Sequence, residues 1–228
     1  NEYMMNQSQL SSLVFAMVIL LWPQSSVTAQ NKEKLLPFGD MNHWVIRNIS
    51  ESAVIGGNTK TLYEVGPNQT INGNKPYKNA GNSPWGTSNV MAKVMGVVKT
   101  NCSVTRDKHA NGYCAKLTTH IEHVKVLGLM NINVLAAGSL FLGSMTEPIT
   151  STKDGPKSLN WGIPFTERPK AIKYDYRVAV SGEKNRIKQN GFSKPSSVPG
   201  QDYAITVLVL QKRTEDAKGN ITAKRVGT

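Results

Sequence analysis

The sequence predicts an all-β fold, an antiparallel β-sandwich or jelly roll, on three observations. Segments that alternate apolar and polar residues recur after residue 43, and clusters of Gly, Pro, Asn and Asp separate them. No helical periodicity of useful length follows the N-terminal segment. Short strands at this spacing, divided by turn signals, are typical of sandwiches and jelly rolls.

The N-terminal segment has the features of a cleavable signal peptide. Its apolar run, Leu10–Trp22, is shorter than the roughly 20 residues that a membrane-spanning helix needs. Val27 and Ala29 fit the small-residue cleavage pattern, so we expect cleavage after Ala29 and export to the periplasm or cell surface. The alternative is an uncleaved membrane anchor, whereas no membrane span is expected after cleavage.

The predicted organisation is therefore a signal peptide at residues 1–29, an N-terminal linker at 30–42 and one β-sandwich domain at 43–228. About 200 residues after the leader suffice for one sizeable sandwich. The last predicted hairpin runs directly into the final residues, so we expect the domain to be truncated at its C-terminus.

The first half of the domain contains three predicted strand regions. Trp44–Ile49 and Lys60–Val65 alternate apolar and polar residues, and a long loop, Gly66–Ser83, follows them. Asn89–Thr100 is rich in β-branched residues, and Gly96 is expected to mark a bulge within it.

The second half contains the stronger strand signals. Tyr113–Leu127 is long enough for one bent strand or two, and Leu135–Gly143 is almost wholly apolar and should be buried. Pro169–Val180 alternates well, Tyr203–Lys212 is the strongest strand signal, and Ile221–Val226 should pair with it as a hairpin.

The formal net charge of +12 allows an anionic partner, such as an acidic polysaccharide. The basic residues are spread singly or in pairs, and the sequence has no run of five and no nucleic-acid-binding signature. We therefore expect no specific nucleic-acid binding, and mostly solvated charge.

The two cysteines, Cys102 and Cys114, leave two alternatives open. Export permits a disulfide between them if they lie on adjacent strands of a hairpin. The alternative is two separate thiols that pack as small hydrophobic side chains.

Catalytic signals are weak. Glycoside hydrolysis needs two convergent carboxylates, and the weak candidates are Glu122 and Asp175, which lie within predicted strands. His120 and His123 are three residues apart on a predicted strand, so their rings should point to opposite faces. We expect no metal site and no cofactor, although a structural Ca²⁺ would leave no signal in the sequence.

Aromatic residues in loops give the strongest functional signal. A sugar ring packs on a flat aromatic ring while polar neighbours bond its hydroxyls. We expect Trp85 and Trp161 to be such platforms, Asn89 to bond hydroxyls, and Tyr174 to do either. Tyr77 is a further candidate, and the alternative for each Trp is that it fills the edge of the sandwich.

Four motifs occur in an order that resembles a known family. They lie at residues 85–89, 112–119, 136–143 and 162–171, and the match extends over most of the chain after the leader. They resemble the putative carbohydrate metabolism domain family, exported proteins of polysaccharide-degrading Gram-negative bacteria. Cys114 departs from the pattern, because the family usually has a small residue there.

The resemblance implies a jelly-roll sandwich like those of carbohydrate-binding modules, and it implies a polysaccharide or oligosaccharide partner. We therefore expect a glycan-binding module for polysaccharide capture or processing at the cell envelope. The alternatives are a glycoside hydrolase or lyase with a carboxylate pair, and a structural or adhesive envelope protein without ligand. In the last case Trp85 and Trp161 should both be buried.

Overall fold

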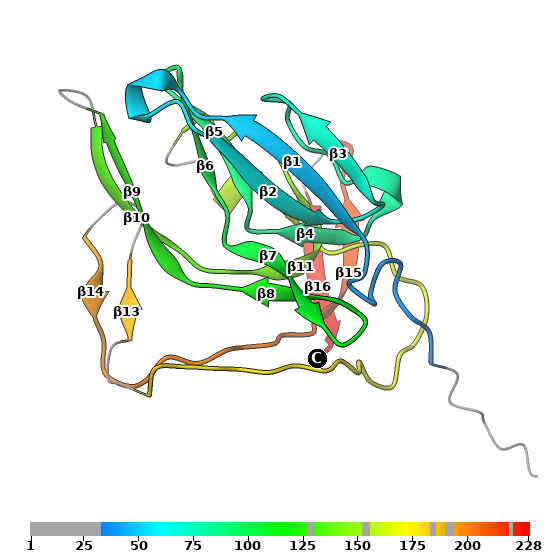
Figure 1. Ribbon diagram of the computed structural model, residues 1–228. Helices are drawn as coiled ribbons and strands as arrows, with labels where there is room; N and C mark the ends of the chain where they lie inside the picture. Colours follow the sequence, from blue (N-terminus) through cyan, green and yellow to red (C-terminus); the bar gives the residue numbers. More distant parts are fainter. Residues whose placement is uncertain (1–32, 127–129, 152–155, 183–185, 190–193, 219–220) are drawn as a thin grey trace, which may run out of the picture. The chain divides into compact units, whose positions relative to one another are not determined.

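The computed structural model is all-β with mainly antiparallel sheets, as the sequence predicts, and is consistent with a β-sandwich (Figure 1). It describes residues 33–126, 130–151, 156–182, 186–189, 194–218 and 221–228. Its helices in these ranges are short 3₁₀ turns, and none could cross a membrane. The predicted signal peptide falls outside the described residues, and everything below concerns the unit Leu35–Thr228.

Most strands pair with a sequence neighbour, and two sets of three form larger sheets, β2–β1–β3 and β12–β11–β4. The strands in the described ranges are β1 (Trp44–Ser50), β2 (Thr59–Val65), β3 (Gln69–Asn72), β4 (Trp85–Thr87), β5 (Val90–Val94), β6 (Val97–Asn101), β7 (Val104–His109), β8 (Gly112–Leu117), β9 (His120–Val126), β10 (Met130–Ala136), β11 (Leu140–Met145), β12 (Leu159–Trp161), β13 (Ile187–Lys188), β14 (Ser196–Ser197), β15 (Leu210–Glu215) and β16 (Ile221–Gly227).

Strand β1 is the centre of the first sheet, with β2 antiparallel on one side and β3 parallel on the other. The predicted strands Trp44–Ile49 and Lys60–Val65 are confirmed by β1 and β2. The prediction of an uninterrupted loop at Gly66–Ser83 was wrong, because β3 lies within it. Its sequence, QTIN, has one apolar residue, so it gives almost no strand signal before it is seen beside β1.

The region Asn89–Thr100 is a hairpin and not one bulged strand. Met95 (φ 50°) and Gly96 (φ 81°) are both left-handed, and they turn the chain between β5 and β6. Two residues with positive φ match the twist of a tight hairpin. The region Tyr113–Leu127 likewise divides into β8 and β9, the second of the two expected alternatives.

Among the residues that the structure describes, two apolar clusters form the core. Trp44, Val65 and Val104 make the first, and partly buried side chains from several strands pack around it. The second is smaller and contains Ile49 and Leu62 from β1 and β2. Both clusters follow from the alternation of side chains along β1. Successive residues of a strand point to opposite faces of the sheet, and each face packs against a different set of residues.

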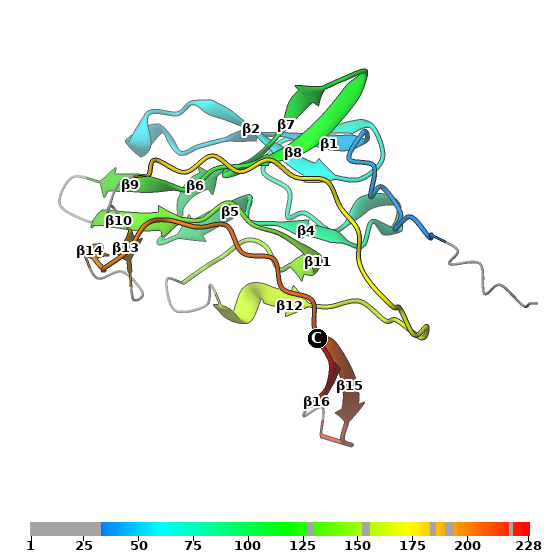
Figure 2. The same cartoon turned by 90° about the horizontal axis from the view of Figure 1, so that it is seen from below.

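Two predicted strands are not paired in the structure. Pro169–Val180 and most of Tyr203–Lys212 run as extended chain without strand pairing, and β15 begins only at Leu210 (Figures 1 and 2, yellow and orange traces without arrows). Their alternating side chains stay in solvent: Tyr176 is 75% exposed and Ile205 is 73% exposed. Alternation indicates an extended backbone, whereas pairing requires a neighbouring strand as well. The final hairpin, β15–β16, forms as predicted.

Candidate functional site

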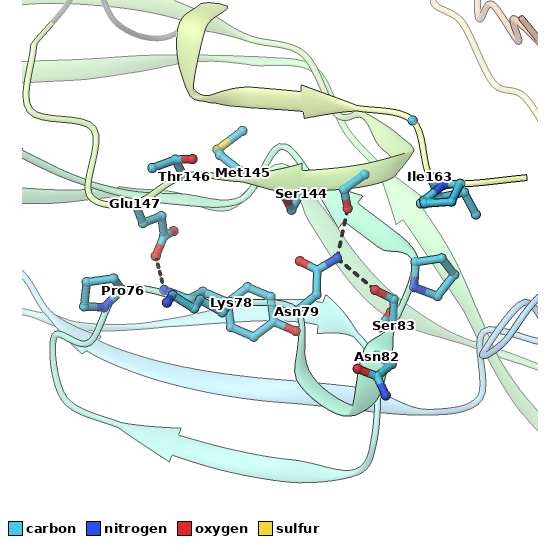
Figure 3. Close-up of a pocket in the computed structure, with 15 residues that line it drawn as sticks. Pro76, Lys78, Asn79, Asn82, Ser83, Ser144, Met145, Thr146, Glu147 and Ile163 are labelled. Carbon is cyan, nitrogen blue, oxygen red and sulfur yellow. Dashed lines mark hydrogen bonds between the residues drawn. The ribbon is translucent and has the colours of Figure 1, made fainter. Parts of the chain in front are cut away.

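A cavity of about 680 Å³ lies between the segment 76–84 and the C-terminal end of β11 (Figure 3). This volume is within the range of about 300–1,000 Å³ that small-molecule sites occupy. Its lining mixes proline and other apolar groups with amide, hydroxyl and charged groups. The lining residues are Pro76, Tyr77, Lys78, Asn79, Asn82, Ser83, Pro84, Gly143, Ser144, Met145, Thr146, Glu147, Gly162, Ile163 and Pro164.

Asn79 fixes the segment 76–84 to the sheet. Its side-chain nitrogen donates to the backbone oxygens of Ser83 (2.9 Å), Trp85 (3.1 Å) and Gly143 (2.9 Å), so it joins the loop to β4 and to β11. The next turn needs Gly81, which has φ of 59°, and a Cβ there would lie 2.9 Å from the ring of Pro67. Asn82, also at positive φ (55°), is exposed at the cavity (Figure 3). Its amide is therefore accessible to a ligand.

Glu147 forms one wall of the cavity, with its side chain 2% exposed. One oxygen, Oε2, accepts from Arg47 Nη2 (2.5 Å) and from the Tyr77 N–H (2.9 Å). The other, Oε1, accepts from Arg47 Nη1 (3.1 Å) and from the Met91 N–H (2.8 Å). Both oxygens are therefore engaged within the fold, and Glu147 supports the wall.

Arg47 joins Glu147 to a second buried carboxylate, Glu64. Arg47 Nη1 donates to Glu64 Oε1 (3.0 Å), and the Thr87 hydroxyl donates to Glu64 Oε2 (2.6 Å). Burial raises the pKa of Glu64 to about 7, against the lowering effects of Thr87 and Arg47, and the charge of Glu147 adds to the rise. One guanidinium, that of Arg47, therefore pairs with two buried carboxylates. Of these, Glu64 has the raised pKa and keeps its proton to a higher pH than an ordinary glutamate.

This carboxylate pair does not have the arrangement that a glycosidase needs. A catalytic acid and its partner must present free oxygens to the substrate. Here Glu64 and Glu147 use their oxygens in hydrogen bonds to Arg47, Thr87 and backbone N–H groups. The accessible groups of the cavity can supply hydrogen bonds, apolar contacts and ionic contacts.

Trp161 is not itself a lining residue, but it precedes the lining residue Gly162, and its backbone pairs with Gly143, which also lines the cavity. Its side chain is 52% exposed, and its ring centre lies 4.6 Å from that of Phe141 at a tilt of 47°. Gly86 pairs with Phe141 across β4 and β11, and a Cβ there would lie 2.7 Å from the Phe141 ring. Glycine thus leaves space for Phe141, and Phe141 supports Trp161 as an accessible aromatic surface.

Trp85 is held differently. It is half-buried in β4, its ring packs against the first core cluster, and its indole N–H donates to the Pro37 oxygen (2.8 Å). The indole polar group is therefore already bonded, and the ring contributes to the core.

The structure places Asn89 and Tyr174 outside the cavity lining. Asn89 is 2% exposed, and its amide makes four bonds, to the Tyr63 and Val104 oxygens and from the Ser103 and Val104 N–H groups. It has no remaining capacity for a hydroxyl. Tyr174 is 48% exposed on the unpaired segment, beside the Tyr176 ring.

The weak catalytic candidates also lie elsewhere. Glu122, in β9, forms an ion pair with Lys99 (3.4 Å) and a hydrogen bond with His120 (2.9 Å), while Asp175 lies on the exposed segment that contains Tyr174. Neither lines the cavity. Within the described ranges, no group of three or more His, Cys, Asp or Glu side chains could hold a metal ion.

The two cysteines are separate free thiols, the second of the two alternatives. Strands β7 and β8 pair Cys114 with Asp107, five residues along the chain from Cys102. At about 3.3 Å per residue this offset is roughly 16 Å, well beyond the limit of about 7 Å between bridged Cα atoms. Burial raises the pKa of the Cys102 thiol to about 11, so it stays protonated.

Sequence reasoning missed most of the cavity. Of the lining residues it included Tyr77, which is 9% exposed, while Trp161 precedes the lining residue Gly162. It did not find Lys78, Asn82 or Glu147, because the segments that carry them are ordinary loops until folding brings them together. One signal was present: the sequence N-A-G-N-S-P at residues 79–84 indicates a constrained turn next to Trp85.

Comparison with known proteins gives one match. The model of the family described as putative carbohydrate metabolism domain matches residues 59–225, which include the cavity and Trp161. No curated protein and no solved structure matches.

Proposed function

The chain belongs to the putative carbohydrate metabolism domain family, and on this premise we propose that it is an exported glycan-binding module that captures polysaccharide at the cell envelope. The observation that carries the proposal is the cavity together with the exposed ring of Trp161, whose neighbours Gly162 and Gly143 line that cavity. The ring offers a flat face for a sugar, and the nearby amide of Asn82 and hydroxyls of Ser144 and Thr146 suit its hydroxyl groups.

The accessible groups favour binding over cleavage. The carboxylates of Glu64 and Glu147 are hydrogen-bonded to Arg47. Glu122 and Asp175 are not among the residues that line the cavity. A purely structural envelope protein would bury both loop tryptophans, whereas Trp161 is half exposed. Binding without chemistry is therefore the simplest use of this surface.

The experiment is a glycan array with the domain, followed by an assay of reducing-sugar release on every glycan that binds. The account predicts binding without release. Trp161→Ala should weaken binding about fivefold to a hundredfold, because loss of one well-packed aromatic contact costs about 1–3 kcal/mol. Tyr203→Ala is the control, since Tyr203 is 61% exposed and outside the cavity lining.

Two results would count against the proposal. Sugar release that depends on Glu122 or Asp175 would favour a glycoside hydrolase or lyase. Equal weakening by Trp161→Ala and Tyr203→Ala would remove the cavity as the binding site.

A further inference from the structure

The segment 169–180 is extended chain without strand pairing, and one of its two sides is apolar. Successive side chains of an extended chain point to opposite sides. The rings of Tyr174 and Tyr176, two positions apart, accordingly lie together, with their centres 5.6 Å from each other. Five large apolar side chains follow this side, and each is at least 46% exposed: Ile172, Tyr174, Tyr176, Val178 and Val180. An unpaired extended segment of this kind is a template for a further strand.

The other side of the segment carries its charges. Lys173, Asp175 and Arg177 lie there at every second position, and Asp175 is the single acidic residue between Pro169 and Val180. Asp175 and Arg177 are both exposed, and neither forms an ion pair with another described residue. Their charges are therefore available to a strand that pairs with the segment.

A second copy of the segment complements the first in an antiparallel register. When Tyr176 lies directly opposite its own copy, Asp175 lies opposite Arg177, and symmetry makes this charge pair occur twice. The apolar sides then coincide, in the pairs Tyr174 with Val178 and Ile172 with Val180. Opposite charges and aromatic–β-branched pairs that lie directly across two strands both stabilise the pairing of those strands.

The neighbouring registers lose one of these two features. Centring the pair on Asp175 or on Arg177 brings two like charges directly opposite each other, which destabilises the pairing. Centring it on Tyr174 places Val180 opposite Arg168, so apolar contact is lost at that end. A slip by one residue puts the apolar side of one copy beside the charged side of the other. Charge and apolar pattern together therefore favour the register centred on Tyr176.

We propose that two copies of this chain form a two-fold symmetric dimer, in which residues 171–181 of each copy pair antiparallel about Tyr176. Backbone hydrogen bonds between the two strands supply affinity, and the two Asp175–Arg177 pairs set the register. The segment is not part of the cavity lining, so this inference does not depend on the proposed glycan-binding function. It assigns to the molecule a second interaction surface, whose partner is its own copy.

Sedimentation velocity over a range of protein concentrations tests the dimer. The wild-type protein should change from monomer to dimer as its concentration rises. Asp175→Arg and Arg177→Asp each place like charges opposite one another, so each should weaken dimerisation about tenfold or more. The double variant Asp175→Arg/Arg177→Asp restores opposite charges and should return the dimerisation constant to within about threefold of the wild type. Asp202→Arg makes the same charge change at another exposed residue and should alter it less than about twofold.

Disulfide cross-linking tests the register. Tyr176→Cys should form a covalent dimer under mild oxidation, because directly opposite residues of an antiparallel pair have Cα atoms about 4.5–5.5 Å apart. Tyr174→Cys should not, because position 174 lies opposite position 178, and four positions along a strand span about 13 Å. Both variants retain Cys102 and Cys114, so the wild type measures any cross-linking through those thiols.

The segment has no strand partner within one chain, so every variant should unfold at the wild-type temperature in dilute solution, where the protein is monomeric. A wild type that stays monomeric up to about 1 mM overturns the inference and leaves a different partner as the occupant of the segment. A dimer that both single charge variants leave intact, or that Tyr174→Cys cross-links as fully as Tyr176→Cys, overturns it as well. Neither result alters the glycan-binding proposal, because the glycan array reports on binding and not on the dimer.

Discussion

At the scale of single residues, Arg47 has the greatest influence on the site. It is 1% exposed and holds Glu64 and Glu147, and Glu147 in turn holds the backbone of Tyr77 at the cavity. A buried pair that is complete contributes little net stability, whereas a broken one leaves charges in a low-dielectric interior. The wall of the cavity therefore depends on one guanidinium.

Replacing Arg47 by Met should lower the free energy of unfolding by about 3–5 kcal/mol, because it leaves the carboxylates without their counter-charge. Urea denaturation measures this change. Arg177→Met, on the exposed segment, is the control and should change stability by less than about 0.5 kcal/mol. A loss of under about 1 kcal/mol in Arg47→Met would contradict the assigned role.

The raised pKa of Glu64 predicts that the stability of the protein depends on pH. Burial raises this pKa to about 7 from the ordinary value of 4.5. Between pH 4.5 and about pH 7 the folded state therefore holds more protons than the unfolded state. The stability that protonated Glu64 contributes is fully present below pH 4.5 and is lost as the pH rises through about 7. Urea midpoints at about pH 5 and about pH 8 should differ less in Glu64→Gln than in wild type. An unchanged difference, equal to that in the exposed control Glu167→Gln, would exclude Glu64 as the source.

At the scale of elements, Gly143 joins β11 to β12. It has φ of 140°, its N–H donates to the Pro84 oxygen (2.8 Å), and a Cβ there would meet the Asn160 oxygen of β12. The same residue lines the cavity and accepts from Asn79. A side chain at this position would push apart the two strands that carry Trp161 and the cavity wall.

Gly143→Ala should therefore reduce both stability and glycan binding. Gly73→Ala is a matched control, because Gly73 also has positive φ (91°) but has open space around it. The control should lose only about 1–2 kcal/mol from backbone strain, with binding retained. Thermal unfolding and titration of both variants distinguish the clash from the strain, and equal losses would show that the clash is unimportant.

Some strands and turns could be predicted from the sequence, and others could not. Trp44–Ile49 and Lys60–Val65 were predictable because alternation reports on a strand with one buried face. The turn at Met95–Gly96 was missed because a single glycine is equally consistent with a bulge. Strand β3 was missed because its identity as a strand depends on its pairing with β1, and its own sequence has almost no apolar pattern.

At the scale of the whole molecule, the site depends on contacts between distant segments. Glu147 bonds to Arg47, one hundred positions away in the sequence, and Asn79 bonds to Gly143, sixty-four positions away. No local pattern encodes such a pair. The local sequence did not decide which tryptophan is exposed, because Trp85 and Trp161 both lie beside Gly, and only the fold packs Trp85 against the core and leaves Trp161 52% exposed.

The free thiols give a whole-molecule test of the strand register. Cys102 and Cys114 should both be alkylated by iodoacetamide after denaturation without a reductant, and reductant should leave the unfolding temperature of the protein unchanged. Mass spectrometry counts the adducts. An unmodified pair that reacts only after reduction would contradict the pairing of Cys114 with Asp107.

The central claim is that the surface beside Trp161 binds a sugar. It is tested most directly by nuclear magnetic resonance of the tryptophan indole N–H groups while the protein is titrated with a glycan that binds on the array. The Trp161 signal should shift, because Trp161 is 52% exposed next to the lining residue Gly162, while the signal of Trp44, 1% exposed in the core, should stay in place. A saturating titration that leaves the Trp161 signal unmoved would contradict the account.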